Sequence, residues 1–369
     1  MTKKVVYFHY FISDTIMKLA LESDTLIEGI RENDSATDGL IIGFEKLGYK
    51  VVFDYKTDFF GFPNFFVKFK FFNLIKRVYK KVFRKLDSYL LNKLLQKKIL
   101  ANKANLLFTV LNPTISIGTL LFLKENNIKS IEWFGVFPFQ FKSRDNVILT
   151  VPHFDLIVSA GNLLPHFDNR FKPASFLQVP PALNFKSIKK WELSIVERKK
   201  YSHDIVFIGS VAKVHSNRWD ILEAISKKYK NLSIYGYGID NVPDKYAFKK
   251  NYKGSIWGDD YGKVISNSKI VLNLFLNNYS KMASGMNTRA FEIPGCGSFE
   301  LSQYVPNLEE FFTIGEDIEA FKDVNDLLNK IDYYLKNKEE REIIANCGFQ
   351  KVQQYTFSNL IKKILTKLN

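Results

Sequence analysis

The amino-acid sequence predicts an α/β protein with two domains, each built on a parallel β-sheet. The chain has 369 residues, and single domains usually hold roughly 100–200. In both halves, short apolar runs typical of buried strands alternate with segments of helical periodicity. Prolines and a charged stretch fill residues 171–200 between the halves, which predicts a linker. We therefore predict an N-terminal domain over residues 1–180, a C-terminal domain over 200–355 and a final helix over 356–369.

The elements of the first half follow a strand–helix–strand order. Val5 to His9 reads as a buried strand, and Ser35 or Asp38 is suited to cap the helix that ends near Gly48. A second strand begins at Val51. The same half contains further apolar runs that predict strands over 106–111, 128–133 and 156–159 and a helix over 115–125.

The second half repeats this alternation. Its apolar runs predict strands over residues 205–208, 232–235, 270–275 and 299–301. Helices are expected over 216–230 and from Thr288 onward. From Ile318 to the end we expect helices only.

The charge of the chain is concentrated in one segment. The formal net charge is +15, and residues 64–103 carry twelve Lys or Arg and one acid, a net of +11. Two cysteines fit a reducing compartment. The N-terminus enters a strand pattern directly, and no apolar run reaches the ~18 residues of a membrane span. We therefore expect a cytoplasmic protein that touches a membrane at most at its surface.

Residues 64–103 allow three interpretations. Apolar residues from Phe71 to Leu94 have helical spacing, so the segment fits a domain helix whose lysines face solvent. It also fits a membrane-surface helix that binds anionic lipid or a lipid-linked acceptor. RNA binding is the third. We expect the first two, which can share the segment, and not a nucleic-acid partner. The residues assigned to the membrane or acceptor are Phe65, Phe66, Lys68, Lys70 and Arg77.

The turn after the strand over 205–208 is suited to bind a diphosphate. Gly209 and Ser210 follow the strand, and Arg218 lies on the next helix. A glycine at the end of a parallel strand lets a ligand approach the backbone, and the following helix N-terminus favours anions. A plain strand–turn–helix with solvated basic residues is the alternative.

A second cluster of polar residues begins at Ser284. Asn287 is suited to cap a helix, and Arg289 lies in its first turn, where a cation is unfavourable unless an anion is close. Glu292 follows one turn later, and a carboxylate can accept two hydrogen bonds from the vicinal hydroxyls of a ribose. The alternative is an Arg–Glu surface pair before the helix ends.

The run Asn287-Thr288-Arg289-Ala290-Phe291-Glu292 resembles the Asn-x-Arg-x-Phe-Glu signature of a branch of the group-1-type glycosyltransferases. The similarity spans about residues 205–365 and includes Tyr252-Lys253-Gly254 and the segment 268–273. It implies a GT-B fold, in which two Rossmann-like domains face each other across a cleft.

The resemblance also implies a donor site in the C-terminal domain. Glu292 would hold the donor ribose, and Arg289, Gly209 and Ser210 would lie near the diphosphate. Ser284 stands where many relatives carry a second Glu, so we assign no retaining mechanism. Glu300 also lies eight residues from Glu292, but on the wrong side of the motif, and we give this spacing no role. The complete donor-binding set is Gly209, Ser210, Arg218, Asn273, Ser284, Asn287, Arg289 and Glu292.

An inverting transfer requires a base that takes the proton of the acceptor hydroxyl. Asp14 is our first choice because it follows the first strand, where α/β clefts open. His9 and Glu132 are the other candidates, ahead of His153 with Asp155. No metal site and no cofactor are expected, because Arg, Lys and helix dipoles can stabilise a leaving diphosphate.

The sequence thus predicts a glycosyltransferase that moves a sugar from a nucleotide-diphosphate sugar to an acceptor. The acceptor would be a cell-envelope glycan or a lipid-linked oligosaccharide, reached at the inner face of the membrane. Two alternatives are a GT-B sugar-nucleotide epimerase and a non-catalytic module that binds a polyanion or a membrane.

Overall fold

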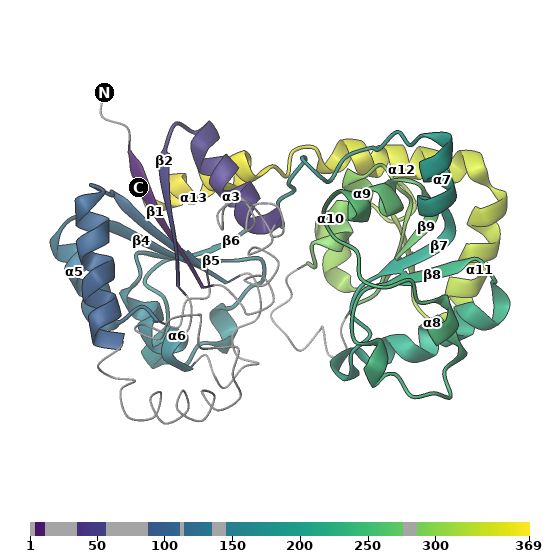
Figure 1. The fold of residues 1–369 in the computed structure, drawn as a ribbon, viewed down its shortest axis with the longest axis horizontal. Coiled ribbons are helices and arrows are strands. Elements are labelled where there is room, and N and C mark those ends of the chain that lie inside the picture. The colour runs from purple at the N-terminus through teal and green to yellow at the C-terminus, as the bar shows by residue number, and fades with distance from the viewer. Residues whose placement is uncertain (1–3, 12–34, 57–87, 111–113, 135–144, 276–285) are drawn as a thin grey trace. The chain divides into compact units, whose positions relative to one another are not determined.

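The computed structural model describes residues 4–11, 35–56, 88–110, 114–134, 145–275 and 286–369 (Figure 1). The chain forms two compact units. The first holds residues 1–31, 40–179 and 361–369, and the second holds 32–39 and 180–360. Each unit contains one parallel sheet with helices packed against it, so the predicted α/β class is confirmed.

The first unit is built on a six-stranded sheet with the order β2-β1-β3-β4-β5-β6, and every neighbouring pair is parallel. Stacked aromatic rings fill its core: the Phe8 and Phe108 centroids are 5.3 Å apart, and Phe44 packs edge-on against Phe108. The strands are β1 (Val5–Phe11), β2 (Lys50–Lys56), β3 (Leu106–Val110), β4 (Lys129–Phe134), β5 (Leu156–Ser159) and β6 (Phe176–Gln178). The helices are α3 (Ser35–Lys46), residues 88–101, α5 (Ile117–Glu125) and α6 (Asp145–Thr150).

The second unit is built on a five-stranded parallel sheet with the order β11-β10-β9-β7-β8. One face packs against α9 and α10, and the other against α8 and α11. The strands are β7 (His203–Ile208), β8 (Leu232–Tyr235), β9 (Ser268–Asn273), β10 (Glu300–Gln303) and β11 (Glu319–Phe321). The helices are α7 (Ile195–Tyr201), α8 (Asn217–Lys228), α9 (Gly258–Ser266), α10 (Arg289–Gly295), α11 (Val324–Lys336) and α12 (Lys338–Val352). The last helix, α13 (Phe357–Leu368), begins in this unit and belongs to the first unit from Ile361 onward.

The strand order of the second sheet fixes where a ligand can bind. The chain adds β8 on one side of β7 and then crosses to add β9 on the other side. Connections after these strands therefore diverge at the carboxyl ends of β7 and β9. In doubly wound sheets this switch point opens a crevice that binds ligands. Gly209 and Leu274 directly follow the two strands, so the residues around them are the first place to look for a site.

Two sequence predictions of secondary structure are wrong. The expected linker over 171–200 contains β6, which pairs in parallel with β5 and extends the first sheet. The expected all-helical segment after Ile318 begins with β11, which pairs with β10. Both strands are only three residues long. Such short runs are too brief to show strand periodicity in a sequence.

The apolar stripe predicted for the basic segment is also wrong where it can be checked. Residues 71–87 lie outside the described residues. Within 88–101, Leu90 and Leu94 are 40% and 37% exposed, whereas Leu95 is buried. The buried side of this helix also carries Asn92 and Gln96. Asn92 accepts a 2.7 Å hydrogen bond from the hydroxyl of Thr119, on α5, and Gln96 donates a 3.1 Å hydrogen bond to the same hydroxyl. Counting apolar residues misses a helix face that packs through amides.

Of the helices that the structure describes, none combines the length and the apolar character that crossing a bilayer requires.

Candidate functional site

The turn after β7 holds a glycine and an arginine in close contact. The guanidinium of Arg289, at the start of α10, donates a 2.7 Å hydrogen bond from Nη1 to the carbonyl oxygen of Ile208. A Cβ atom at Gly209 would lie 2.1 Å from the same Nη1 and 2.9 Å from the ring of Phe207. Any larger residue at position 209 would therefore displace the arginine. Glycine here sets the position of a charged group.

A second arginine ties the ends of β7 and β9 together. Arg218, on α8, is only 3% exposed. Its Nη1 donates 2.7 Å to the carbonyl of Ser210, and its Nη2 donates 2.8 Å to the carbonyl of Leu274. Its Nε is buried and has no hydrogen-bond partner among the described residues. Arg218 thus holds the two strand ends that border the switch point.

These basic groups raise the positive potential at the switch point. Within the described part of the chain, neither arginine forms an ion pair with a carboxylate. Burial and the nearby Arg289 lower the pKa of Arg218 to about 9. Burial, followed by both arginines, lowers the pKa of His215 to about 4, so this imidazole is neutral. Two cations held close together without a carboxylate partner favour a bound anion.

A chain of amide hydrogen bonds fixes the start of α10. The side-chain amide of Asn287 donates 2.9 Å to Asn273 Oδ1, and Asn287 Oδ1 accepts a 3.0 Å bond from the backbone N–H of Ala290. Asn273 is fully buried and donates 2.8 Å to Glu300 Oε1. Glu300 therefore acts on the first turn of α10 through two asparagines. This chain orients the helix that carries Arg289.

Glu300 itself is buried at the start of β10, with 1% of its surface exposed. Its Oε2 has no hydrogen-bond partner among the residues that the structure describes. Burial raises the pKa of Glu300 to about 8, although the hydrogen bond from Asn273 opposes the rise. The carboxyl is therefore mostly protonated at neutral pH, and the switch point keeps its positive charge.

Glu292 lies one turn beyond Arg289 on α10. Its carboxylate accepts a 2.6 Å hydrogen bond from the hydroxyl of Tyr261, on α9. Burial raises the pKa of Glu292, whereas Tyr261 and Arg289 lower it. Glu292 is partly exposed. A carboxylate and a guanidinium thus share one helix at the carboxyl edge of the sheet, and the tyrosine fixes the rotamer of the carboxylate.

Comparisons with known proteins bear on the fold and on the second half of the chain. Residues 218–366 match the model of a family described as glycosyl transferase-like. A glycosyltransferase from Rickettsia africae superposes with a TM-score of 0.63 at 13% identity, over 100% of this chain and 98% of the other. Sucrose-phosphate synthase from Thermosynechococcus elongatus gives 0.61 at 11% identity, over 99% of both chains. An α-glucosyltransferase in complex with UDP-glucose and DNA gives 0.60 at 11% identity, over 99% of both chains. No curated protein matches the sequence significantly.

The chain has the GT-B fold. The expected pair of Rossmann-like domains is confirmed, and the segment that matches the family model lies within the region of predicted resemblance. In this GT-B chain, the carboxyl edge of the second sheet is the best-supported candidate site.

The structure brings together most of the predicted donor residues of the GT-B chain. Gly209 contacts Arg289, Ser210 accepts from Arg218, and Asn287 bonds to Asn273. Arg218 and Asn273 are buried at the carboxyl edge of the sheet, and Ser284 lies outside the described residues. The sequence missed Tyr261 and Glu300. Tyr261 lies on α9, where the sequence predicts no helix, and Glu300 acquires its role only from the pairing of β10 with β9.

The predicted catalytic residues belong to the first unit. Glu132 is fully buried, and its carboxylate accepts a hydrogen bond from the hydroxyl of Thr109. His9 lies on β1 in register with Thr109, so the backbones of His9 and Glu132 flank the same residue. The side chain of His9, and all of Asp14, lie outside the described residues. So do the proposed membrane residues Phe65, Phe66, Lys68, Lys70 and Arg77.

We expect Glu300→Gln to change how the stability of the protein depends on pH. The folded-state pKa of about 8 lies above the ordinary glutamate value of 4.5, so the native state binds more protons between these two pH values. Stability then falls as pH rises through this window. Glu300→Gln cannot lose stability in this way. Between pH 5 and pH 8 its free energy of unfolding should therefore rise, relative to that of the wild type, by on the order of a few kcal/mol.

Urea unfolding of both proteins at the two pH values measures this difference. The exposed substitution Glu316→Gln is the control and should leave the pH dependence of the wild type unchanged. Equal pH dependence in Glu300→Gln and wild type would show that Glu300 is ionised in the folded protein.

Proposed function

We propose that the protein is a glycosyltransferase that uses a nucleotide-diphosphate sugar as donor. The observation that carries the proposal is the pair of arginines at the β7/β9 switch point, which lack carboxylate partners among the described residues. A crevice at this edge of a doubly wound sheet is where nucleotides bind. The match of residues 218–366 to a glycosyl transferase-like family supports the same activity.

Arg289 is proposed to bind the donor diphosphate. One of its five N–H donors is used by the carbonyl of Ile208, which orients the guanidinium and leaves others for a ligand. A guanidinium forms bidentate hydrogen bonds with phosphate oxygens. The absence of a side chain at Gly209 lets the diphosphate approach the backbone, and the N-terminus of α8 favours the same charge. As the sugar leaves, these groups stabilise the charge that develops on the diphosphate.

Glu292 is proposed to bind the ribose of the donor. Tyr261 donates to one oxygen of the carboxylate, and a carboxylate has about four acceptor sites, so Glu292 can also accept from ribose hydroxyls. The superposable α-glucosyltransferase was solved in complex with UDP-glucose, which supports a nucleotide sugar as the donor class. We propose a hexosyl donor.

The acceptor is proposed to be a cell-envelope glycan or a lipid-linked oligosaccharide, and the protein to act in the cytoplasm at the inner face of the membrane. The net charge of +11 over residues 64–103 motivates the membrane contact. Asp14 remains the proposed base, with His9 and Glu132 as the other candidates. A donor-only assay followed by NMR separates transfer from epimerisation, because an epimerase would convert the nucleotide sugar without an acceptor.

The roles of Arg289 and Glu292 predict different ligand profiles for two variants. Arg289→Gln should weaken binding of both pyrophosphate and the preferred nucleoside diphosphate by about 10- to 100-fold, since a hydrogen bond to a charged group contributes ~1.5–3 kcal/mol. Glu292→Gln should weaken the nucleoside diphosphate but leave pyrophosphate unchanged, because pyrophosphate has no ribose. Calorimetry measures both, after a thermal-shift screen has found the preferred base.

Two exposed substitutions in other parts of the chain, Arg170→Gln and Glu316→Gln, serve as matched controls and should bind like the wild type. The site assignment fails if Arg289→Gln retains full affinity. Equal loss of pyrophosphate binding in both variants would contradict the separate roles of the two residues.

We further propose that transfer does not depend on a metal ion, because Arg289 and the α8 N-terminus are positioned to stabilise the leaving diphosphate. Turnover with the preferred donor should stay within about twofold of the untreated rate in excess EDTA, a difference of less than ~0.5 kcal/mol in the barrier. Loss of turnover in EDTA and its recovery with Mg²⁺ or Mn²⁺ would refute this.

A further inference from the structure

A concave site lies in the second unit at the amino edge of its sheet, opposite the proposed donor site. This groove has a volume of about 1130 Å³ and is lined by residues at the amino ends of three parallel strands. His203 begins β7, Leu232 begins β8, and Lys269 lies near the start of β9. Because the strands are parallel, the groove is separated by the length of the sheet from the donor crevice at their carboxyl ends.

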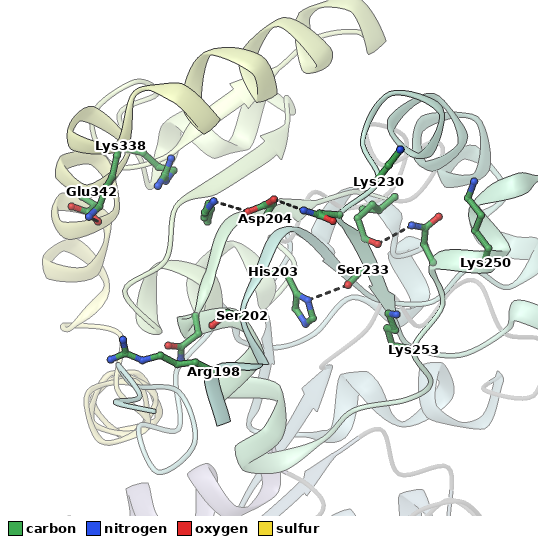
Figure 2. A pocket seen from close by; sticks show the side chains of 16 residues that line it. Arg198, Ser202, His203, Asp204, Lys230, Ser233, Lys250, Lys253, Lys338 and Glu342 are labelled. Atoms are coloured by element: carbon green, nitrogen blue, oxygen red, sulfur yellow. Dashed lines mark hydrogen bonds and ion pairs between the residues drawn. The ribbon is translucent and has the colours of Figure 1, made fainter. Parts of the chain in front are cut away.

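Basic side chains border the groove on two sides. In Figure 2, Arg198 and Lys338 lie on one side, and Lys230, Lys250 and Lys253 on the other. The full basic set is Arg198, Lys230, Lys250, Lys253, Lys269, Lys338 and Arg341, against the two acids Asp204 and Glu342. The groove therefore carries a strong positive charge.

The acids of the groove already have partners. Asp204 forms a 2.6 Å ion pair with Lys269, and Glu342 lies 3.6 Å from Lys338 one helical turn away. Lys230 and Lys250 are exposed and form no ion pair with any residue that the structure describes. Cations gathered in a concave surface and not paired with carboxylates raise the local concentration of anions. The unpaired lysines therefore favour an anionic ligand.

The floor between the two basic sides holds the Asp204–Lys269 ion pair and, beside it, uncharged polar groups. The imidazole Nδ1 of His203 lies 3.1 Å from Ser233 Oγ, as Figure 2 shows. Burial and Lys253 lower the pKa of His203, so its ring is neutral at pH 7. Asn251 donates 2.9 Å to the Leu232 carbonyl, yet its buried Oδ1 has no partner among the described residues. Such a floor suits hydroxyl groups, which both donate and accept hydrogen bonds.

We propose that this groove binds a strand of an acidic glycan, a carbohydrate chain that carries carboxylate, phosphate or sulfate groups. The hydroxyls of the glycan would form hydrogen bonds with the uncharged polar groups of the floor, and its anionic groups would pair with the lysines on either side. Of the described residues that line the groove, none is a Phe, Tyr or Trp, the large rings on which single-stranded nucleic acids stack. A concave floor also fits a chain better than a flat lipid surface. The inference concerns binding alone and stands apart from the proposed sugar transfer.

The test uses the full chain and two forms of one carbohydrate. A fluorescent oligogalacturonate supplies carboxylates, and its methyl ester has the same backbone without charge. Anisotropy should give an affinity for the acid that is at least about tenfold higher, with a loss of binding as salt rises. In Lys230→Glu/Lys250→Glu the affinity for the acid should fall by about tenfold or more.

The control variant is Lys245→Glu/Lys322→Glu, which changes the net charge equally at exposed positions outside the groove and should bind within about twofold of the wild type. Thermal melting checks the fold, and Lys230→Gln and Lys250→Gln replace the double variant if it unfolds. Equal binding of acid and ester, or an equal effect of the control, overturns the proposal. So does tighter binding of single-stranded DNA or anionic vesicles through Lys230 and Lys250. Nucleoside diphosphate binding, measured on the same proteins, reports separately on the proposed donor site.

Discussion

The contact between the Arg289 guanidinium and the backbone at Gly209 is the interaction on which the candidate site depends. The arginine is anchored by the Ile208 carbonyl and fits only because position 209 lacks a Cβ atom. Arg218 holds the ends of β7 and β9 together by donating to the carbonyls of Ser210 and Leu274. The topology places this contact at the switch point of the sheet, where the carboxyl ends of β7 and β9 lie side by side. Gly209, after β7, and Arg289, on α10, come together there.

The electrostatics of the same region favour an anion over an internal ion pair. Arg218 and Arg289 lie close enough to lower the pKa of His215, while the buried Glu300 has a raised pKa and is mostly neutral at pH 7. Because it is mostly neutral, Glu300 does not cancel the positive charge of the two arginines. Cations fixed before the ligand arrives need no reorganisation when charge develops on a leaving group. The network through Asn273 and Asn287 serves this end, since it holds the helix that carries Arg289.

Sequence patterns predict the parts of this protein that depend on local spacing. Most strands were found because they are continuous apolar runs, and the Arg289–Glu292 pair because its members lie one helical turn apart. The site residues that the sequence does not predict owe their roles to contacts between elements far apart in the chain. Glu300 reaches Asn287 only because β10 lies beside β9, and Tyr261 reaches Glu292 from another helix. Asn92 and Gln96 pack through amides, so a search for apolar periodicity misplaced the buried face of their helix.

The most direct test of the account is a crystal structure of the protein with its preferred nucleoside diphosphate. We expect phosphate oxygens within hydrogen-bond distance of the Arg289 guanidinium, roughly 2.7–3.2 Å, with the ribose hydroxyls on Glu292. The diphosphate should lie against Gly209 without moving the turn. A nucleotide bound elsewhere, with Arg289 and Glu292 pointing away from it, would contradict the central claim.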